Sequence, residues 1–173
     1  MLGLDRAGKT SILYRMILNE DVTNLTGQKD GFVGLRCGLE PLNIIPGLNL
    51  QICDLDGSKN ARSLWMNYIS RQGHKNGRSI LRISFQSVFL WPIKSMNGLI
   101  WVVDSEDRDR FKESRDELMN LLQSDCIRGR IPILLLANKQ DRKHALHSSD
   151  VARFLEFHKI CTKDEVTIVD AIN

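Results

Sequence analysis

Residues 3–10 constrain the possible folds of this chain more than any other stretch. They read Gly-Leu-Asp-Arg-Ala-Gly-Lys-Thr and fit G-x-x-x-x-G-K-[ST], the pattern of a loop that wraps nucleotide phosphates. In such a loop the glycines let backbone N–H groups turn inward, Lys9 supplies positive charge, and the Thr10 hydroxyl is a Mg²⁺ ligand. Apolar residues recur with helical spacing from position 12 to 17, so a helix is predicted to begin near Lys9. Alone, the motif also fits a glycine-containing turn before an amphipathic helix.

Composition places the chain among ordinary globular proteins. Its 173 residues, 42% apolar and 26% charged, predict a single domain over residues 1–173 with one sizeable core. No apolar run reaches the roughly 18–20 residues that span a bilayer, and the scattered cysteines predict reduced thiols in a cytoplasmic protein. The net charge of +3 comes from residues 69–97, which carry five basic residues and no acid, so we expect no nucleic-acid partner.

Short apolar runs alternate with amphipathic stretches along the chain. A mostly parallel sheet between two helical layers is therefore predicted, an α/β fold of three layers with one antiparallel edge hairpin. Ligands of such sheets bind at the carboxyl ends of the strands, where the phosphate loop also lies. The predicted strands are 98–104, 131–137 and 166–169, the predicted hairpin is 42–45 with 48–52, and the predicted helices are 107–123 and a segment capped by Ser149.

Two further motifs come directly after predicted strands. Residues 54–57 read Asp-Leu-Asp-Gly, in which Asp54 can hold Mg²⁺ through water and the Gly57 N–H can reach a γ-phosphate. Residues 138–141 read Asn-Lys-Gln-Asp, and the carboxylate of Asp141 can accept two N–H bonds from guanine but not from adenine. Each motif alone fits a polar turn or a helix cap, but three motifs in this order, each after a strand, favour a nucleotide site.

With these motifs the chain resembles the Arf and Arf-like family of Ras-like small GTPases. The resemblance covers residues 1–68 and 98–173 and depends on residues 3–10, Gly31-Phe32, Leu64-Trp65-x-x-Tyr68, the run 98–108 and the run 137–141. It implies the Ras-like P-loop fold and a Mg²⁺-dependent GDP/GTP switch, with an exchange factor, an activating protein and effectors as partners. It also implies a role in vesicle traffic or signalling, as a monomer that can contact endomembranes peripherally.

The resemblance implies a role for each matching position. Lys9 and Ser58 occupy the catalytic positions, and Thr10 and Asp54 the metal positions. The nucleotide-binding positions are Gly3, Asp5, Arg6, Ala7, Gly8, Lys9, Thr10, Ser11, Gly57, Asn138, Lys139, Asp141 and Ala171.

Two departures from the family concern the γ-phosphate. Asp56, Gly57 and Ser58 stand where the family has two glycines and a glutamine that orients the attacking water. Serine is too short to reach the same place, and Asp56 adds negative charge, so we expect weak intrinsic hydrolysis and weaker GTP binding. The family's Mg²⁺-ligating threonine falls near Lys29, and only a register shift would bring Thr26 into its place.

The other departures concern extra and missing segments. About two dozen extra residues, roughly 70–95, are interpreted either as a basic arm for an acidic partner or membrane surface, or as a disordered gene-model artefact. Both ends are short against the family, so the fold is expected to be truncated, with no glycine at position 2 for myristoylation.

Three functions remain open from the sequence. The first is an Arf-like GTP-binding switch whose GTP hydrolysis depends on an activating partner. The second is a degenerate pseudo-GTPase that holds GDP or nothing and serves as a binding scaffold. The third, an ATP-using P-loop enzyme, is disfavoured by the guanine-reading pattern at 138–141.

Overall fold

A computed structural model describes residues 1–18, 35–37, 42–45, 48–50, 52–69, 97–124, 127, 131–159 and 166–170. Its centre is a parallel sheet in the order β5 (Leu99–Asp104), β6 (Ile133–Asn138) and β7 (Val166–Asp170). The first two residues extend this sheet beyond β5. Leu2 bonds to Ile100 and Val102, and the Met1 carbonyl accepts a bond from Leu55 in β4 (Cys53–Leu55). The two residues before the phosphate loop therefore pair with β5 and β4 in the manner of a short strand.

Two antiparallel two-stranded sheets accompany the parallel sheet. The strand β1 (Leu35–Cys37) pairs with β4, and β2 (Leu42–Ile45) pairs with β3 (Leu48–Leu50). The first ladder joins 35–37 to 53–55, and the second joins 42–45 to 48–50 with a register shift between Leu42 and Ile45. The predicted antiparallel hairpin is confirmed over 42–45 and 48–50, and the structure adds the β1–β4 ladder that periodicity did not indicate.

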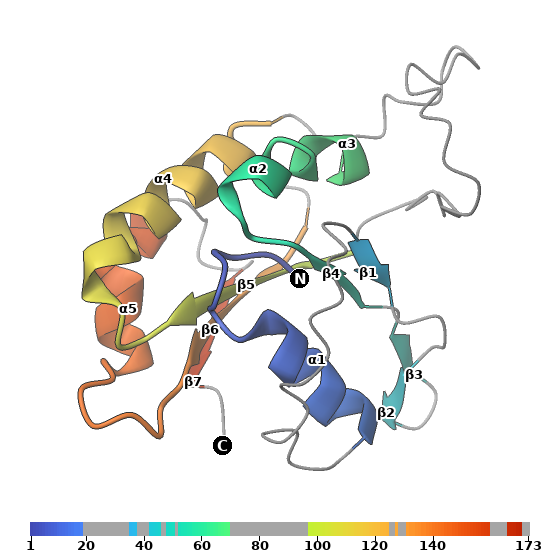
Figure 1. Ribbon diagram of the computed structural model, residues 1–173, viewed down its shortest axis with the longest axis horizontal. Coiled ribbons are helices and arrows are strands. Elements are labelled where there is room, and N and C mark those ends of the chain that lie inside the picture. The colour runs from blue at the N-terminus through green and yellow to red at the C-terminus, as the bar shows by residue number, and fades with distance from the viewer. Residues whose placement is uncertain are drawn as a thin grey trace.

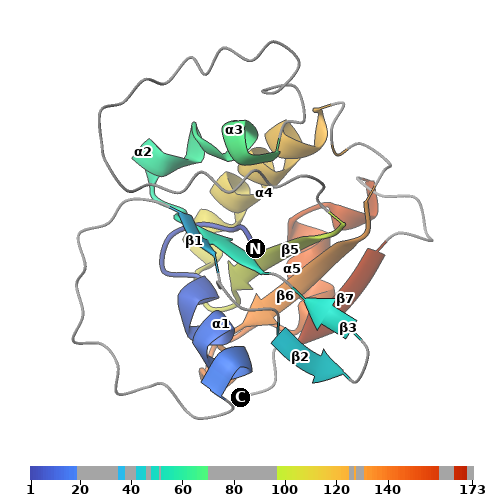
Figure 2. The same cartoon turned by 90° about the vertical axis from the view of Figure 1, so that its right-hand side faces the viewer.

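Helices flank the sheet on two sides. Figures 1 and 2 both place α1 (Lys9–Leu18) on the side opposite to α2 (Lys59–Arg62), α3 (Trp65–Ile69) and α4 (Phe111–Leu122). The helix α5 (Ser148–Phe154) packs against α4, β6 and β7, and single 3₁₀ turns precede α4 and follow α5, at Arg108–Arg110 and Phe157–Lys159. The predicted three-layer α/β arrangement is confirmed.

The core lies between the sheet and the helices α3, α4 and α5. The predicted inward face of α4 is confirmed, since Phe111, Leu118, Leu121 and Leu122 are all buried. Trp101 in β5 is fully buried and meets Trp65 of α3 edge to face, with ring centroids 5.8 Å apart. None of the helices within the described ranges is long and apolar enough to cross a bilayer.

Two predicted helix starts are wrong. The helix predicted from 107 begins at Phe111, because Arg108–Arg110 form a tighter 3₁₀ turn. Ser149 is not the N-cap of α5. His147 takes that position with an extended backbone, and its ring accepts the Ser149 N–H. Element boundaries depend on local capping geometry that apolar periodicity does not specify.

Candidate functional site

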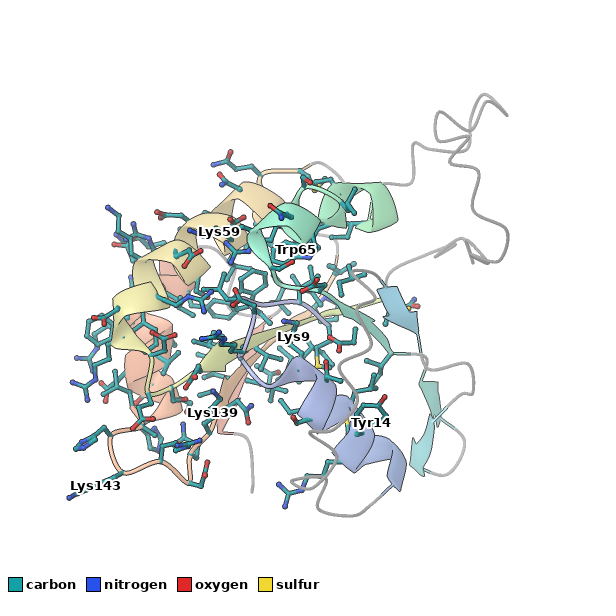
Figure 3. The ribbon with its side chains drawn as sticks, in the orientation of Figure 1. Lys9, Tyr14, Lys59, Trp65, Lys139 and Lys143 are labelled. Carbon is teal, nitrogen blue, oxygen red and sulfur yellow. The ribbon has the colours of Figure 1, made fainter. Side chains whose placement is uncertain are left out.

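Three predicted motifs meet around one cavity of about 540 Å³ at the carboxyl ends of β4 and β6. A cavity of this size lies within the usual range for small-molecule sites. Figure 3 labels two of its basic residues, Lys9 from the start of α1 and Lys139 from the loop after β6. The lining comprises Asp5, Arg6, Gly8, Lys9, Thr10 and Ser11 of the phosphate loop, Asp54, Leu55, Asp56 and Gly57 of the second motif, and Lys139 of the third.

The side chain of Lys9 is bonded to the backbone of its own loop. The Nζ of Lys9 donates to the carbonyl oxygens of Gly3 and Leu4 at 3.0 and 2.8 Å, and the residue is only 6% exposed. Gly8 has φ +91°, and a Cβ there would lie 2.2 Å from the Asn138 amide nitrogen. Only glycine fits this position, which explains the motif's second glycine in physical terms.

Burial also sets the protonation behaviour of the loop lysine. Removal from water lowers the pKa of Lys9, although the carboxylates of Asp54 and Asp56 oppose the shift. A bound phosphate would add negative charge beside the amine and favour the charged form further. Lys9 is therefore placed to act as a cation toward phosphate.

The two predicted metal ligands touch each other. The Thr10 hydroxyl donates to Oδ2 of Asp54 at 2.6 Å, and Asp54 is 4% exposed. Hard oxygen donors suit Mg²⁺, which is usually held by one or two protein ligands together with waters and substrate phosphates. Among the described residues no group of three or more histidine, cysteine or acidic side chains could hold a metal alone. The Thr10–Asp54 pair therefore fits Mg²⁺ bound together with a nucleotide.

The second motif is seated directly on the phosphate loop. A Cβ on Gly57 would lie 2.2 Å from the Gly3 carbonyl oxygen, and the Gly57 carbonyl accepts the Asp5 N–H at 3.2 Å. Asp56 bonds to the backbone N–H and the hydroxyl of Ser58 at 2.9 and 3.0 Å. Asp56 thus lines the cavity, whereas the Ser58 hydroxyl is engaged by Asp56 and Ser58 is absent from the lining.

The third motif divides into an inner and an outer part. Asn138 donates to the Ala7 carbonyl at 2.8 Å, and Lys139 forms an ion pair with Asp104. Asp141 lies outside the cavity lining with its side chain 58% exposed, 3.8 Å from Arg142. The predicted base contacts of Asn138, Lys139 and Asp141 stay predictions, since the structure brings only Lys139 to the cavity wall.

Some predictions fall outside the described residues. These are the guanine contact of Ala171, the displaced threonine Thr26 and the whole insertion at 70–95. Trp65, which the sequence places in the core or at an interface, is 2% exposed and donates to the Asp56 carbonyl at 2.8 Å. The indole ring of Trp65 is therefore a buried contact of the second motif and is not part of an exposed surface.

Sequence reasoning missed two arginines beside the site. Arg62 and Arg110 both bond to Asp5 of the phosphate loop, at 3.3 and 2.6 Å. Their shared partner Glu113 lies four residues before Glu117, which also pairs with Arg62. An acidic i, i+4 pair on a predicted helix was the available signal, because like charges at this spacing repel unless a cation lies between them.

Comparison with known proteins agrees with the geometry. The model of the ADP-ribosylation factor family matches residues 1–74 and 77–172. A solved structure of the Arl6 (BBS3) small GTPase from Trypanosoma brucei, with the bound nucleotide analogue GppNp, superposes with a TM-score of 0.70 at 23% identity, covering 99% of this chain and 83% of that one. This similarity shows a shared fold. On the family match, the chain belongs to the ADP-ribosylation factor family of GTP-binding small GTPases.

Proposed function

We propose that this chain is a GDP/GTP switch that binds its nucleotide with Mg²⁺ and hydrolyses GTP slowly unless an activating partner assists. The observation that carries the proposal is the convergence of Lys9, Thr10 and Asp54 at one cavity, with Thr10 and Asp54 2.6 Å apart. A cation and a hard-oxygen pair beside inward-turning loop amides are the groups that a Mg²⁺–nucleotide complex needs.

Hydrolysis in this proposal is in-line attack of water on the γ-phosphate. Lys9 and the loop N–H groups stabilise the charge that develops on the phosphate oxygens. Thr10 and Asp54 would hold a Mg²⁺ ion, which would supply further positive charge there. Weak turnover is supported by the position of Ser58, whose short side chain bonds to Asp56.

The alternative is a pseudo-GTPase scaffold that holds GDP or no nucleotide. It is favoured by one observation, the carboxylate of Asp56 at the cavity wall beside the predicted γ-phosphate position. Fluorescent GDP, GTP and ATP titrated with and without Mg²⁺, followed by phosphate release, separate the two proposals. GTP binding with slow phosphate release supports the switch. Binding of GDP alone, or of nothing, supports the scaffold, and a preference for ATP contradicts both.

Partners and location follow from family membership as further parts of the proposal. We propose that an exchange factor, an activating protein and effectors act on this monomer in traffic or signalling, in the cytoplasm and peripherally at endomembranes. Purified exchange and activating proteins of the family, added to the nucleotide assay, test the regulator part. Unchanged GDP release and GTP turnover with every regulator would contradict it.

A further inference from the structure

A cluster of five charged side chains adjoins the cavity, and four of the five lie outside the nucleotide motifs. It joins Asp5 of the phosphate loop, Arg62 of α2, Arg110 of the 3₁₀ turn before α4, and Glu113 and Glu117 of α4. We call these five residues the arginine cluster. Three acidic side chains face two arginines, so the negative charge of the cluster exceeds its positive charge by one.

Arg62 is the centre of the arginine cluster. Its side chain is only 6% exposed, and a buried guanidinium must find acceptors for its donors. Its Nε donates to the Gly57 carbonyl at 2.7 Å, and Nη1 donates to Glu113 at 2.8 Å and to Glu117 at 3.1 Å. Its Nη2 lies 3.3 Å from Asp5. One side chain thus holds the second motif, the phosphate loop and α4 at the same time.

Gly57 connects this cluster to the cavity. Its carbonyl oxygen accepts bonds from both the Asp5 N–H and Arg62 Nε, at 3.2 and 2.7 Å. Its backbone has no room for a side chain against the phosphate loop. Asp5 and Gly57 both line the cavity. Any movement of loop 56–58 away from the phosphate loop must therefore break the Arg62 bond or carry Arg62 away from α4.

Arg110 supports the same arrangement from the other side. Its Nη2 bonds to Asp5 at 2.6 Å, and its Nε bonds to Glu113 at 3.1 Å. Asp5 and Glu113 are therefore shared by the two arginines. Shared partners make the bonds interdependent, so the loss of one is expected to loosen the others.

We propose that Arg62 is a positioning residue that holds loop 56–58 against the phosphate loop and thereby makes nucleotide release depend on α4. The positioning part stands on the contacts alone, and the release part rests on the proposed function. When the guanidinium of Arg62 is removed, the Gly57 carbonyl keeps only the Asp5 N–H as a donor. Loop 56–58 then separates from the phosphate loop more often. A partner that displaces Glu117 on α4 would then speed release without touching the nucleotide.

The test uses Arg62→Lys and Glu117→Ala, with Asp116→Ala as the matched control on the same helix. Lysine keeps the charge but cannot reproduce the fork of donors, and Glu117 lies outside the cavity lining. Asp116 forms an ion pair with Arg115, which is not part of the arginine cluster, and its side chain is 51% exposed. Two readouts are measured, amide exchange in the nucleotide-free protein and dissociation of fluorescent GDP with Mg²⁺.

The expected result is local. The Asp5 amide should exchange at least fivefold faster in Arg62→Lys and at least twofold faster in Glu117→Ala, whereas the Val102 amide in the sheet should be unchanged. GDP should dissociate faster by similar factors in both variants and at the wild-type rate in Asp116→Ala. Glu117→Ala decides the outcome if Arg62→Lys does not fold.

Three results would overturn the inference. Exchange of the Asp5 amide within twofold of the wild type in every folded variant would remove the positioning role. Equal acceleration of the Asp5 and Val102 amides would show a general loss of stability in its place. A wild-type protein without GDP affinity would remove the release part and the proposed function together, while the amide exchange would still decide the positioning part.

Discussion

The candidate site has a phosphate side, formed by Lys9, Thr10 and Asp54, and a base side, formed by Asp141. The side chains of the phosphate side are bonded within the protein, whereas the side chain of the base side is mostly exposed. On the phosphate side, Lys9 is 6% exposed and bonded to two loop carbonyls, and Thr10 meets Asp54 at 2.6 Å. On the base side, the side chain of Asp141 is 58% exposed and lies 3.8 Å from Arg142. We infer that the phosphate side serves both folding and binding, whereas Asp141 serves binding alone.

The largest effect is expected from Lys9→Ala. It removes a buried cation that bonds to two carbonyls and faces the predicted phosphates, so both the fold and binding should suffer. Loss of a charged hydrogen-bonding group of this kind predicts GDP affinity lower by on the order of a hundredfold and a lower melting temperature. Isothermal titration and thermal denaturation measure the two effects. An unchanged melting temperature would break the proposed contrast with Asp141.

Asp141→Ala should separate binding from stability. Because the side chain is mostly exposed, its removal should leave the melting temperature within a degree or two of the wild type. GDP affinity should fall roughly tenfold to a hundredfold, since two bonds from the base to a carboxylate are lost. Arg142→Ala is the matched control and should bind GDP normally. A GDP affinity of Asp141→Ala equal to the wild type would remove the guanine assignment.

Asp56→Gly tests the negative charge on the phosphate side. Removing a carboxylate from the cavity wall should raise affinity for a non-hydrolysable GTP analogue relative to GDP by about fivefold to tenfold, as expected for one nearby charge at partial burial. Ser58→Ala controls for loss of the Asp56–Ser58 bond with the carboxylate kept. A ratio of affinities that does not change in Asp56→Gly would contradict a role of Asp56 in nucleotide choice.

The smallest effect concerns acid stability. The hydrogen bond from Arg62 lowers the pKa of Glu113, and although burial raises the pKa of Asp5, Arg110 lowers it overall. The folded protein therefore binds fewer protons than the unfolded chain, so this stabilisation is present above about pH 4 and is lost as the pH falls through the lowered values.

Glu113→Gln is the variant for this prediction. Its loss of folding free energy below about pH 4.5 should be smaller than in the wild type, by less than about 1 kcal/mol because the pair is partly exposed. Melting curves from pH 7 to pH 3 measure it, with Asp150→Asn as a control on an exposed pair. Parallel acid profiles of Glu113→Gln and the wild type would show that this pair carries no pH-dependent stability.

The parts of the site that the sequence predicted best depend on backbone chemistry. A Cβ at Gly8 or Gly57 would lie 2.2 Å from a neighbouring atom, so only glycine fits at these positions. A requirement of this kind is visible in the sequence as the glycine itself. The strands β5 and β6 were also predicted closely, because buried parallel strands are continuous apolar runs.

The parts that sequence reasoning missed depend on contacts between distant segments. Arg62 bonds to Glu113, fifty-one positions away, and no local sequence pattern predicts that pairing. The cap at His147 was missed for a different reason, since histidine is not among the preferred capping residues. The base contact of Asp141 stays a prediction, because its side chain is 58% exposed and the contact would form only with a bound ligand.

The most direct test of the account is the ratio of the dissociation constants of GDP and ADP for the wild-type protein in Mg²⁺. The two nucleotides carry the same phosphates and differ in the base, so the phosphate side cannot distinguish them. We predict that GDP binds at least a hundredfold more tightly than ADP, because adenine leaves the carboxylate of Asp141 without its two donors. Equal dissociation constants for GDP and ADP would contradict it.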